Sequence, residues 1–207
     1  MIILIGNQKG GPGKSTIAML LANYLTQVRT RQVTLIDMDY QQSIVQMSER
    51  AKILDSQPPY EVIAANLEQF EQIKSVLSRN REMIFLIDLP GKLDDDGLIP
   101  LFRNSDLVLC PFAYSELSFD STILFSIVLR KIKPNVVLTF IPNRIKSTVN
   151  YRTKSDVEAQ LLQFGKITPA IPDRIDFQRI TTVSTPSNIQ AIILPIFDQL
   201  YTDHIHR

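Results

Sequence analysis

The stretch Lys9-Gly10-Gly11-Pro12-Gly13-Lys14-Ser15-Thr16 lies between an apolar run, Met1 to Ile5, and an amphipathic segment, Lys14 to Gln27. A strand, a glycine-rich loop and a helix in this order form a site for phosphate, because the glycines let backbone N–H groups point at phosphate oxygens. The lysine of such a loop neutralises phosphate charge, and its hydroxyl residue binds Mg²⁺. The stretch therefore predicts a phosphate-binding loop.

The loop departs from the ordinary pattern G-x-x-x-x-G-K-[ST] at one place. Gly13, Lys14 and Ser15 fit the pattern, but Gln8 occupies the position of its first glycine. An additional lysine, Lys9, stands in the loop. The alternative is a chance cluster of glycine and lysine, and the strand predicted before the loop and the helix predicted after it argue against that alternative.

Apolar runs recur along the chain and alternate with segments of helical spacing. The runs are hydrophobic almost throughout, as expected for parallel strands that are covered on both faces. They are Met1 to Ile5, Val33 to Ile36, Tyr60 to Ala64, Met83 to Ile87, Leu107 to Cys110, Val136 to Ile141 and Ile167 to Ile171. Helices are predicted near Lys14 to Gln27, Leu67 to Ser78, Phe119 to Ile132, Val157 to Phe164 and Asn188 to His204. This order predicts an α/β fold, an open, doubly wound, mostly parallel sheet with helices on both faces, as in P-loop NTPases.

The composition fits one domain. A chain of 207 residues, of which 44% are hydrophobic, can bury a sizeable core. No repeat, linker or change of composition marks a boundary, so we expect residues 1–207 to form a single domain. Neither a signal peptide nor a run long enough to span a bilayer is present, which predicts a cytoplasmic protein. The single cysteine, Cys110, ends an apolar run and is expected to be buried.

Two aspartates, Asp37 and Asp39, follow the apolar run Val33 to Ile36. Alternation along a strand places their side chains on the same side, at the end of a buried strand, where carboxylates need a cation or polar partners. A metal site there would satisfy both. The alternative is that the two aspartates only cap the next helix.

A third aspartate, Asp88, directly follows the apolar residues Ile84 to Ile87. Four apolar residues and an aspartate are the usual form of the strand that supplies a second contact to Mg²⁺ in P-loop NTPases. The motif alone is weak, but it stands at the right place in a series of strands and helices that begins with a phosphate loop. Asp88 is therefore predicted to bind Mg²⁺ through water.

These motifs resemble the deviant Walker-type ATPases of the ParA/MinD class, which includes plasmid and chromosome partition ATPases. The resemblance extends over essentially the whole chain and is most specific at residues 5–16. It implies an Mg²⁺-dependent ATPase that binds ATP and forms an ATP-dependent homodimer. It also implies that Lys9 reaches the nucleotide of the partner subunit, since two triphosphates that face each other need additional positive charge between them.

The same resemblance assigns roles to individual residues. Lys9, Lys14 and Asp39 are the catalytic residues that it implies, with Asp39 positioning the attacking water. Tyr40 occupies the position at which the family has a proline. The resemblance implies that the nucleotide phosphates contact Gly10, Gly11, Pro12, Gly13, Lys14, Ser15 and Thr16. It implies that Mg²⁺ is held by Ser15, Asp37 and Asp88. It also implies that the adenine base contacts Asn143 and Pro172. For Asn143, an Asn-Arg turn without a ligand is the alternative.

The charge is distributed unevenly. Residues 1–120 hold 11 Lys and Arg against 15 Asp and Glu, whereas residues 121–207 hold 11 against 6. The range 121–155 contains seven basic residues and no acidic residue, namely Arg130, Lys131, Lys133, Arg144, Lys146, Arg152 and Lys154. By the resemblance, this stretch binds non-specific DNA in the ATP state, which would associate the protein with the nucleoid. Separate, solvated side chains at helix ends are the alternative.

Other features bear on the partners. The resemblance implies a ParB-like, centromere-binding or adaptor protein that stimulates hydrolysis. The C-terminal segment Ile192 to Tyr201 is apolar but lacks Lys and Arg, so it is expected to pack on the domain and not to bind a membrane. Two alternative functions share the fold: a metabolic ligase of the dethiobiotin-synthetase type, in which ATP activates a carboxylate or carbamate, and an ATP-dependent interaction module that does not hydrolyse.

Overall fold

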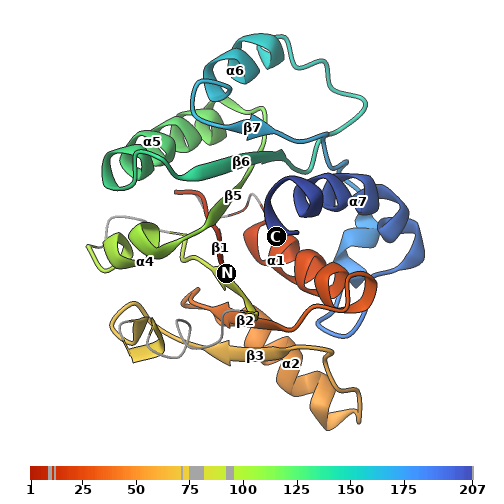
Figure 1. The fold of residues 1–207 in the computed structure, drawn as a ribbon. Coiled ribbons are helices and arrows are strands. Elements are labelled where there is room, and N and C mark those ends of the chain that lie inside the picture. Colours follow the sequence, from red (N-terminus) through yellow and green to blue (C-terminus); the bar gives the residue numbers. More distant parts are fainter. Residues whose placement is uncertain (9–10, 12, 71, 75–81, 92–95, 207) are drawn as a thin grey trace.

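Seven parallel strands form one sheet in the computed structural model, which describes residues 1–8, 11, 13–70, 72–74, 82–91 and 96–206. Their order across the sheet is β3-β2-β4-β1-β5-β6-β7 (Figure 1). The strands are β1 (Ile2–Ile5), β2 (Val33–Asp37), β3 (Glu61–Ala64), β4 (Ile84–Asp88), β5 (Leu107–Phe112), β6 (Val137–Pro142) and β7 (Lys166–Ile167). Every residue of β2, β4 and β5 is buried, because helices cover both faces. The predicted open, doubly wound parallel sheet is confirmed.

The last strand is shorter than predicted. The sequence predicted a strand at Ile167 to Ile171, but β7 ends at Ile167. One more backbone hydrogen bond follows, from the N–H of Thr168 to the carbonyl of Phe140. Pro169 then comes next, and a proline has no N–H with which to continue the ladder.

Helices connect the strands on both sides of the sheet. They are α1 (Lys14–Asn23) with the π-helical turn η1 (Tyr24–Val28), α2 (Ser43–Ile53), α4 (Leu98–Asn104), α5 (Glu116–Ile132), α6 (Lys154–Leu161), the 3₁₀ helix η2 (Ile175–Arg179), and α7 (Ser187–Leu200) with the π-helical turn η3 (Tyr201–Ile205). Of the helix predicted at 67–78, residues 70 and 72–74 are helical, whereas 71 and 75–78 lie outside the described residues.

Two helices were not predicted from the sequence. Only Ile44 and Ser48 of α2 are buried, so this helix lacks the broad apolar face that indicates a helix in a sequence. Helix α4 is a short segment that carries Pro100 in its first turn, where proline is tolerated. The pattern of α2 was therefore too weak, and α4 too short, for the sequence to indicate either helix.

The core consists of two clusters, one on each face of the sheet. Alternate residues of β1 divide between them: Ile3 and Ile5 pack with α1 and α7, whereas Leu4 packs with α4, α5 and α6. Figure 1 shows the same division, with α1, α2 and α7 on one side of the sheet and α4, α5 and α6 on the other. Cys110 is fully buried in the second cluster, as predicted, and burial raises the pKa of its thiol.

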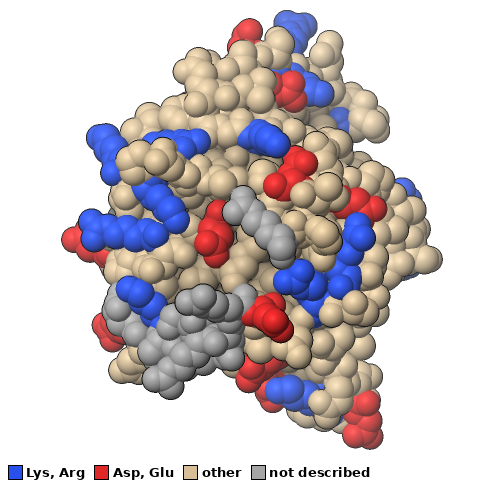
Figure 2. All heavy atoms as spheres, in the orientation of Figure 1, with Lys and Arg blue, Asp and Glu red and all other residues tan. Residues whose placement is uncertain are grey.

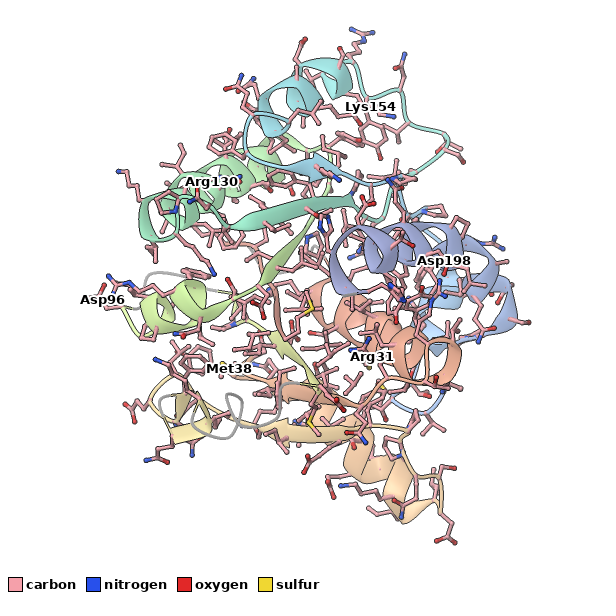
Figure 3. All side chains as sticks on the ribbon, in the orientation of Figure 1. Arg31, Met38, Asp96, Arg130, Lys154 and Asp198 are labelled. Atoms are coloured by element: carbon pink, nitrogen blue, oxygen red, sulfur yellow. The ribbon has the colours of Figure 1, made fainter. Side chains whose placement is uncertain are left out.

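The C-terminal helix packs on α1, as expected from its lack of basic residues. The rings of Tyr24 and Phe197 lie 5.5 Å apart between their centroids. Asp198, labelled in Figure 3, accepts hydrogen bonds from the hydroxyl of Tyr24 at 2.6 Å and from Arg29 at 2.7 Å. The buried residues of α7 are Ile189, Ile193, Ile196, Phe197 and Leu200. Among the described residues, no helix is both long and apolar enough to cross a membrane.

Backbone pairing aligns the carboxyl ends of three neighbouring strands. Ile5 of β1 is paired with Asp88 of β4, and Asp88 is paired with Asp37 of β2. Because these strands are parallel, the loops that follow them leave the sheet at one edge. The phosphate loop leaves β1 between the ends of β4 and β5.

The contact between α7 and α1 yields a stability prediction. Ile193 is 2% exposed and belongs to the cluster that joins the two helices. We expect Ile193→Ala to lower the free energy of unfolding by about 2–5 kcal/mol, because it removes buried methyl groups and leaves a cavity. Chemical denaturation measures this loss. As a control, Ile53→Ala, at a residue 80% exposed on α2, should change it by less than about 1 kcal/mol; equal losses would contradict the assigned packing.

Candidate functional site

The phosphate loop joins the end of β1 to the start of α1. The structure describes Gly11 and residues 13–16 of this loop, whereas Lys9, Gly10 and Pro12 lie outside the described residues. Gly11 and Gly13 have φ angles of 95° and 86°, which side chains of L residues rarely allow. Gly13 directly precedes α1, so the loop ends at a helix N-terminus, where unpaired N–H groups and the helix dipole favour an anion.

Gly13 is also needed for close packing. A Cβ atom at this position would lie 2.4 Å from Nδ2 of Asn143. Asn143 follows β6, is 5% exposed, and donates its backbone N–H to the carbonyl of Phe112 at 2.7 Å. The ends of β5 and β6 thus hold the Asn143 amide directly against the phosphate loop.

Ser15 and Asp88 meet beneath the loop. The hydroxyl of Ser15 donates to Oδ2 of Asp88 at 2.6 Å. The other carboxylate oxygen, Oδ1, is buried and has no hydrogen-bond partner among the described residues. A buried oxygen without a partner is costly, and hydroxyl and carboxylate oxygens are the ligand types that Mg²⁺ prefers. The donor set therefore fits Mg²⁺.

Three carboxylates and one lysine influence each other at this edge. Burial raises the pKa of Asp88 to about 7, although the Ser15 hydrogen bond and the charge of Lys14 lower it. The charges of Asp37 and Asp39 raise the pKa of Asp88 further. Burial likewise raises the pKa of Asp37. A divalent cation would offset this concentration of negative charge.

Asp37 is engaged by the backbone of the next helix. Its Oδ1 accepts the N–H of Asp39 at 3.1 Å, and its Oδ2 accepts the N–H groups of Ile44 at 3.0 Å and Val45 at 3.3 Å. Ile44 and Val45 lie in the first turn of α2, so Asp37 caps this helix from the preceding strand. Helix capping was the alternative interpretation of the aspartate pair in the sequence, and the hydrogen bonds of Asp37 to Ile44 and Val45 are of this kind. A contact of Asp37 with the hydration shell of Mg²⁺ stays a prediction.

Asp39 lies at the turn between β2 and α2. Its Oδ1 accepts the backbone N–H of Gln41 at 2.9 Å, which closes a turn around Tyr40. Asp39 is partly exposed, and Tyr40, at the position where a proline was expected, is 80% exposed. The carboxylate thus stands at the surface of the site, in contrast to the fully buried Asp88.

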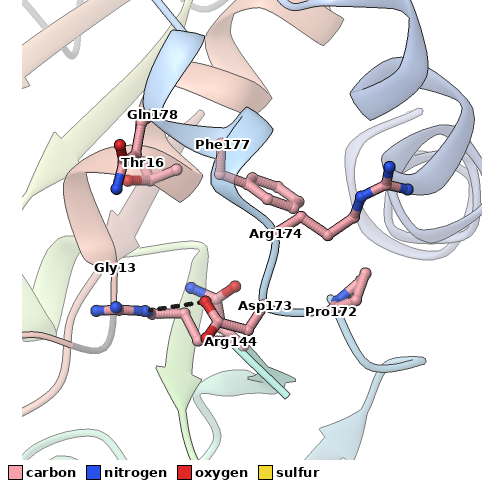
Figure 4. Close-up of a pocket in the computed structure, with 9 residues that line it drawn as sticks. Gly13, Thr16, Arg144, Pro172, Asp173, Arg174, Phe177 and Gln178 are labelled. Atoms are coloured by element: carbon pink, nitrogen blue, oxygen red, sulfur yellow. Dashed lines mark ion pairs between the residues drawn. The ribbon is translucent and has the colours of Figure 1, made fainter. Parts of the chain in front are cut away.

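A cavity of about 280 Å³ adjoins the phosphate loop (Figure 4). Both residues predicted to contact the base, Asn143 and Pro172, line this cavity together with Gly13 and Thr16. The remaining lining residues are Arg144, Asp173, Arg174, Phe177 and Gln178. The cavity offers one aromatic ring and several polar groups next to the predicted phosphate site, which is a suitable composition for a nucleobase and its ribose.

Hydrogen bonds between two loops build the wall of the cavity. The N–H of Ile145 donates to the carbonyl of Ile171 at 3.1 Å, and the N–H of Asp173 donates to the carbonyl of Ile145 at 3.0 Å. Arg144 spans the site: its Nη1 donates to the carbonyl of Gly11 at 3.4 Å, and its Nε lies 3.7 Å from Oδ1 of Asp173. The ion pair is drawn in Figure 4. The loops after β6 and β7 are therefore joined to each other and to the phosphate loop.

The sequence analysis missed several residues of the site. Phe177 and Gln178 reach the cavity from η2, a 3₁₀ helix without a sequence pattern of its own. Asn7 is fully buried and donates from Nδ2 to the carbonyl of Pro111 at 2.9 Å and to Oγ1 of Thr122 at 2.8 Å. Asn7 thereby fixes the start of the loop to β5 and α5. The sequence signal that could have indicated Asn7 is its position as a polar residue between a buried strand and the phosphate loop.

Comparisons with known proteins find a matching family model and similar solved structures. The model of the CobQ/CobB/MinD/ParA nucleotide binding domain family matches residues 3–184. No curated protein sequence matches the chain significantly. A protein of Borrelia burgdorferi B31 described as a plasmid partition protein, solved with AMPPNP, has a TM-score of 0.76 at 23% identity and covers 97% of this chain and 99% of its own.

Two further solved structures share the fold. Cyanothece McdA, in its apo form, has a TM-score of 0.73 at 16% identity over 96% of this chain and 98% of its own. The MinD cell division protein of Aquifex aeolicus has a TM-score of 0.71 at 18% identity over 96% of both chains.

The raised pKa of Asp88 predicts a pH-dependent stability. In the unfolded chain this carboxyl loses its proton near its ordinary pKa of 3.8, and in the folded protein near 7. The folded state therefore binds the proton more tightly, and this group lowers the free energy of unfolding as pH rises from about 4 to 7. Asp88→Asn imitates the protonated acid and keeps an acceptor for Ser15. We expect it to stabilise the nucleotide-free, metal-free protein by up to about 4 kcal/mol at pH 8, and much less at pH 4.

Denaturation curves of both proteins with a chelator, at pH 4 to 8, measure this difference. Glu61→Gln, at an exposed residue of β3, is the control and should leave the pH dependence unchanged. A destabilised Asp88→Asn variant at pH 8 would contradict the assigned burial of an ionised carboxylate.

Proposed function

Because the chain belongs to the CobQ/CobB/MinD/ParA nucleotide-binding family of P-loop ATPases, we propose that it is an ATP-dependent dimerising ATPase that partitions plasmid or chromosomal DNA. It binds non-specific DNA in the ATP state and hydrolyses ATP when a partner protein stimulates it. The observation that carries the nucleotide site is the hydrogen bond between Ser15 and the buried Asp88, next to a cavity that Gly13 and Thr16 line. The other carboxylate oxygen of Asp88 has no hydrogen-bond partner among the described residues.

The nucleotide would lie across the phosphate loop and the cavity. The triphosphate meets the loop residues Gly10 to Thr16, where Lys14 supplies positive charge and the start of α1 supplies N–H groups. The base enters the cavity beside Asn143 and Pro172. Since the Asn143 amide packs against Gly13, the base and the phosphates are held in one fixed relation.

Ser15 and Asp88 are the residues proposed to hold Mg²⁺, Asp88 through water, with Asp37 supporting the hydration shell. When bound, Mg²⁺ neutralises charge on the phosphate oxygens. Asp39 is proposed to orient the attacking water, since its carboxylate is partly exposed at the same edge of the sheet. Lys9 is proposed to reach the nucleotide of a second subunit, where it offsets the repulsion between two triphosphates.

The basic stretch 121–155 divides into two groups. Four residues have partners within the chain: Arg130 and Lys133 donate to backbone carbonyls, Arg144 pairs with Asp173, and Lys154 pairs with Glu158. Lys131, Lys146 and Arg152 are exposed and form no ion pair with another described residue. Figure 2 shows Lys and Arg side chains gathered on the left of the molecule, over α4 and α5. Of these exposed residues, Lys146 and Arg152 are the candidates for phosphate contacts with DNA.

The similar structures support a partition function with a protein partner. The Borrelia structure is described as a plasmid partition protein, and the Aquifex MinD has also been solved as a complex with MinC. For this chain we propose a ParB-like, centromere-binding or adaptor protein as the partner that stimulates hydrolysis.

The proposed function predicts that the protein dimerises with ATP and not with ADP. Light scattering at about 5 µM protein, with a slowly hydrolysed ATP analogue and Mg²⁺, should give a dimer for the wild type and a monomer for Lys9→Ala, because the facing triphosphates lose their shared counter-charge. Both should remain monomeric with ADP. Lys52→Ala removes an exposed lysine on α2 and should dimerise like the wild type. A wild type that stays monomeric with the analogue excludes the sandwich mechanism.

DNA binding makes the second prediction. The double variant Lys146→Ala/Arg152→Ala should bind DNA about five- to tenfold more weakly than the wild type in the presence of the ATP analogue. The plot of log affinity against log salt should become less steep by about 2, since each lost phosphate contact changes the slope by about 0.9. Fluorescence anisotropy over a salt series measures both quantities. Absence of ATP-dependent binding by the wild type at low salt would contradict the partition function and favour a metabolic or protein-directed ATPase.

A further inference from the structure

Helix α5 presents an apolar stripe to solvent. Leu117 is 68% exposed, Leu124 48%, Ile127 38% and Val128 36%. The opposite side of the same helix, with Phe125 and Leu129, is buried in the core. Single exposed apolar residues are common on protein surfaces, but four large ones grouped on one helix form a patch. A patch of this kind is typical of an interaction site.

The exposed side chains follow the spacing of a helix-pairing seam. Leu117, Leu124 and Lys131 are separated by seven residues, and Asp120 and Ile127 lie between them, so all five fall along one line of the helix. Ser121 stands beside this line and donates its hydroxyl to the carbonyl of Leu117 at 2.7 Å, so it adds no unsatisfied donor to the seam. A covering helix must therefore supply partners for Asp120 and Lys131, but not for Ser121.

Charge divides the seam into two ends. Asp120 lies near its start, next to Glu116, and Lys131 lies at its end; the guanidinium of the neighbouring Arg130 donates to the carbonyls of Pro134 and Phe164. Asp120 and Lys131 are both exposed, and neither forms an ion pair with another described residue. They are about 16 Å apart along the helix, which is too far for a contact within one chain. A helix that is acidic at one end and basic at the other is complementary to an antiparallel copy of itself.

We propose that α5 pairs with α5 of a second copy of this chain, antiparallel and around a two-fold axis near Leu124. In this arrangement Leu124 meets its own counterpart, Leu117 lies beside Lys131 of the second copy, and Asp120 pairs with that lysine. The interface is isologous, so each contact occurs twice. The apolar residues supply the association energy, and the two ion pairs select the antiparallel orientation.

This interface is separate from the nucleotide site. Helix α5 packs on the face of the sheet opposite to α1, which carries the end of the phosphate loop. Pairing through α5 needs no nucleotide and does not depend on the proposed function. If the sandwich dimer of the proposed function also forms, the two interfaces together link subunits into longer assemblies, because each subunit then has two different neighbours.

Sedimentation velocity of the nucleotide-free, full-length chain tests the proposal. Between about 5 and 300 µM, the wild type should shift from monomer towards dimer, as mass action requires for a small interface. Leu124→Glu should remain monomeric over this range. Leu54→Glu, at a leucine 76% exposed at the end of α2, is the matched control and should associate like the wild type.

A charge exchange tests the orientation. Lys131→Glu alone and Asp120→Lys alone should each weaken association by about tenfold or more, because each places like charges together twice per dimer. The double variant Asp120→Lys/Lys131→Glu should regain the wild-type association. A general defect of the helix would not be rescued in this way, and denaturation curves verify that each variant folds.

Two results would overturn the proposal. One is a wild type that stays monomeric up to about 300 µM, a range in which such an interface should associate. The other is a double variant that associates no better than the two single variants. Light scattering with the ATP analogue at about 5 µM, where α5 pairing is negligible, reports the sandwich dimer separately, so failure of one interface is distinguishable from failure of the other.

Discussion

The in-register pairing of β1, β4 and β2 is the constraint on which the site depends. Parallel pairing sets Ile5, Asp88 and Asp37 side by side, so that three loops leave the sheet at one edge. The first turn of α1 then lies at the end of β4, where the hydroxyl of Ser15 donates to Asp88 at 2.6 Å. A shift of one residue in β4 would turn the Asp88 side chain to the other face of the sheet and separate it from Ser15.

The same pairing concentrates negative charge in a buried place. Asp88 is fully buried and Asp37 is paired next to it in the sheet. Among the described residues, Ser15, Lys14 and backbone N–H groups act against the cost of burying the two carboxylates. Buried carboxylates close together lower the stability of the ligand-free protein because they repel each other. A bound cation offsets this repulsion, so the arrangement favours cation binding. The buried carboxylates thus lower the free energy of unfolding of the nucleotide-free protein, and they form a site that is suited to a cation.

The two faces of the sheet differ in what they offer to partners. On the face of α1 and α7, the apolar side chains of the C-terminal helix pack against the core. Asp198 of this helix accepts hydrogen bonds from Tyr24 and Arg29. On the other face, α5 covers the core with one side and leaves Leu117 and Leu124 exposed on the other. Leu117 is 68% exposed and Leu124 48% exposed, and Asp120 and Lys131 near the ends of this stripe carry opposite charges that a second copy would match.

The sequence by itself determined the elements whose signal is local. Glycines at positions 11 and 13, a lysine and a hydroxyl next to a helix start indicated the phosphate loop, and long apolar runs indicated the parallel sheet, because buried strands and anion sites impose residue types on adjacent positions. Asp88 was predicted as a metal ligand from the four apolar residues before it, and the structure places it beside Ser15; its binding of Mg²⁺ stays a prediction.

Only the tertiary structure decided which distant residues meet. Helix α2 has no broad apolar face of its own, helix α4 is short and carries Pro100, and the backbone N–H groups that engage Asp37 belong to α2. Phe177 reaches the cavity from a short 3₁₀ helix, and Asn7 is held by Pro111 and Thr122, more than a hundred residues further along the chain. Such contacts depend on how strands pair and loops cross, and neither propensity nor spacing along the chain records them.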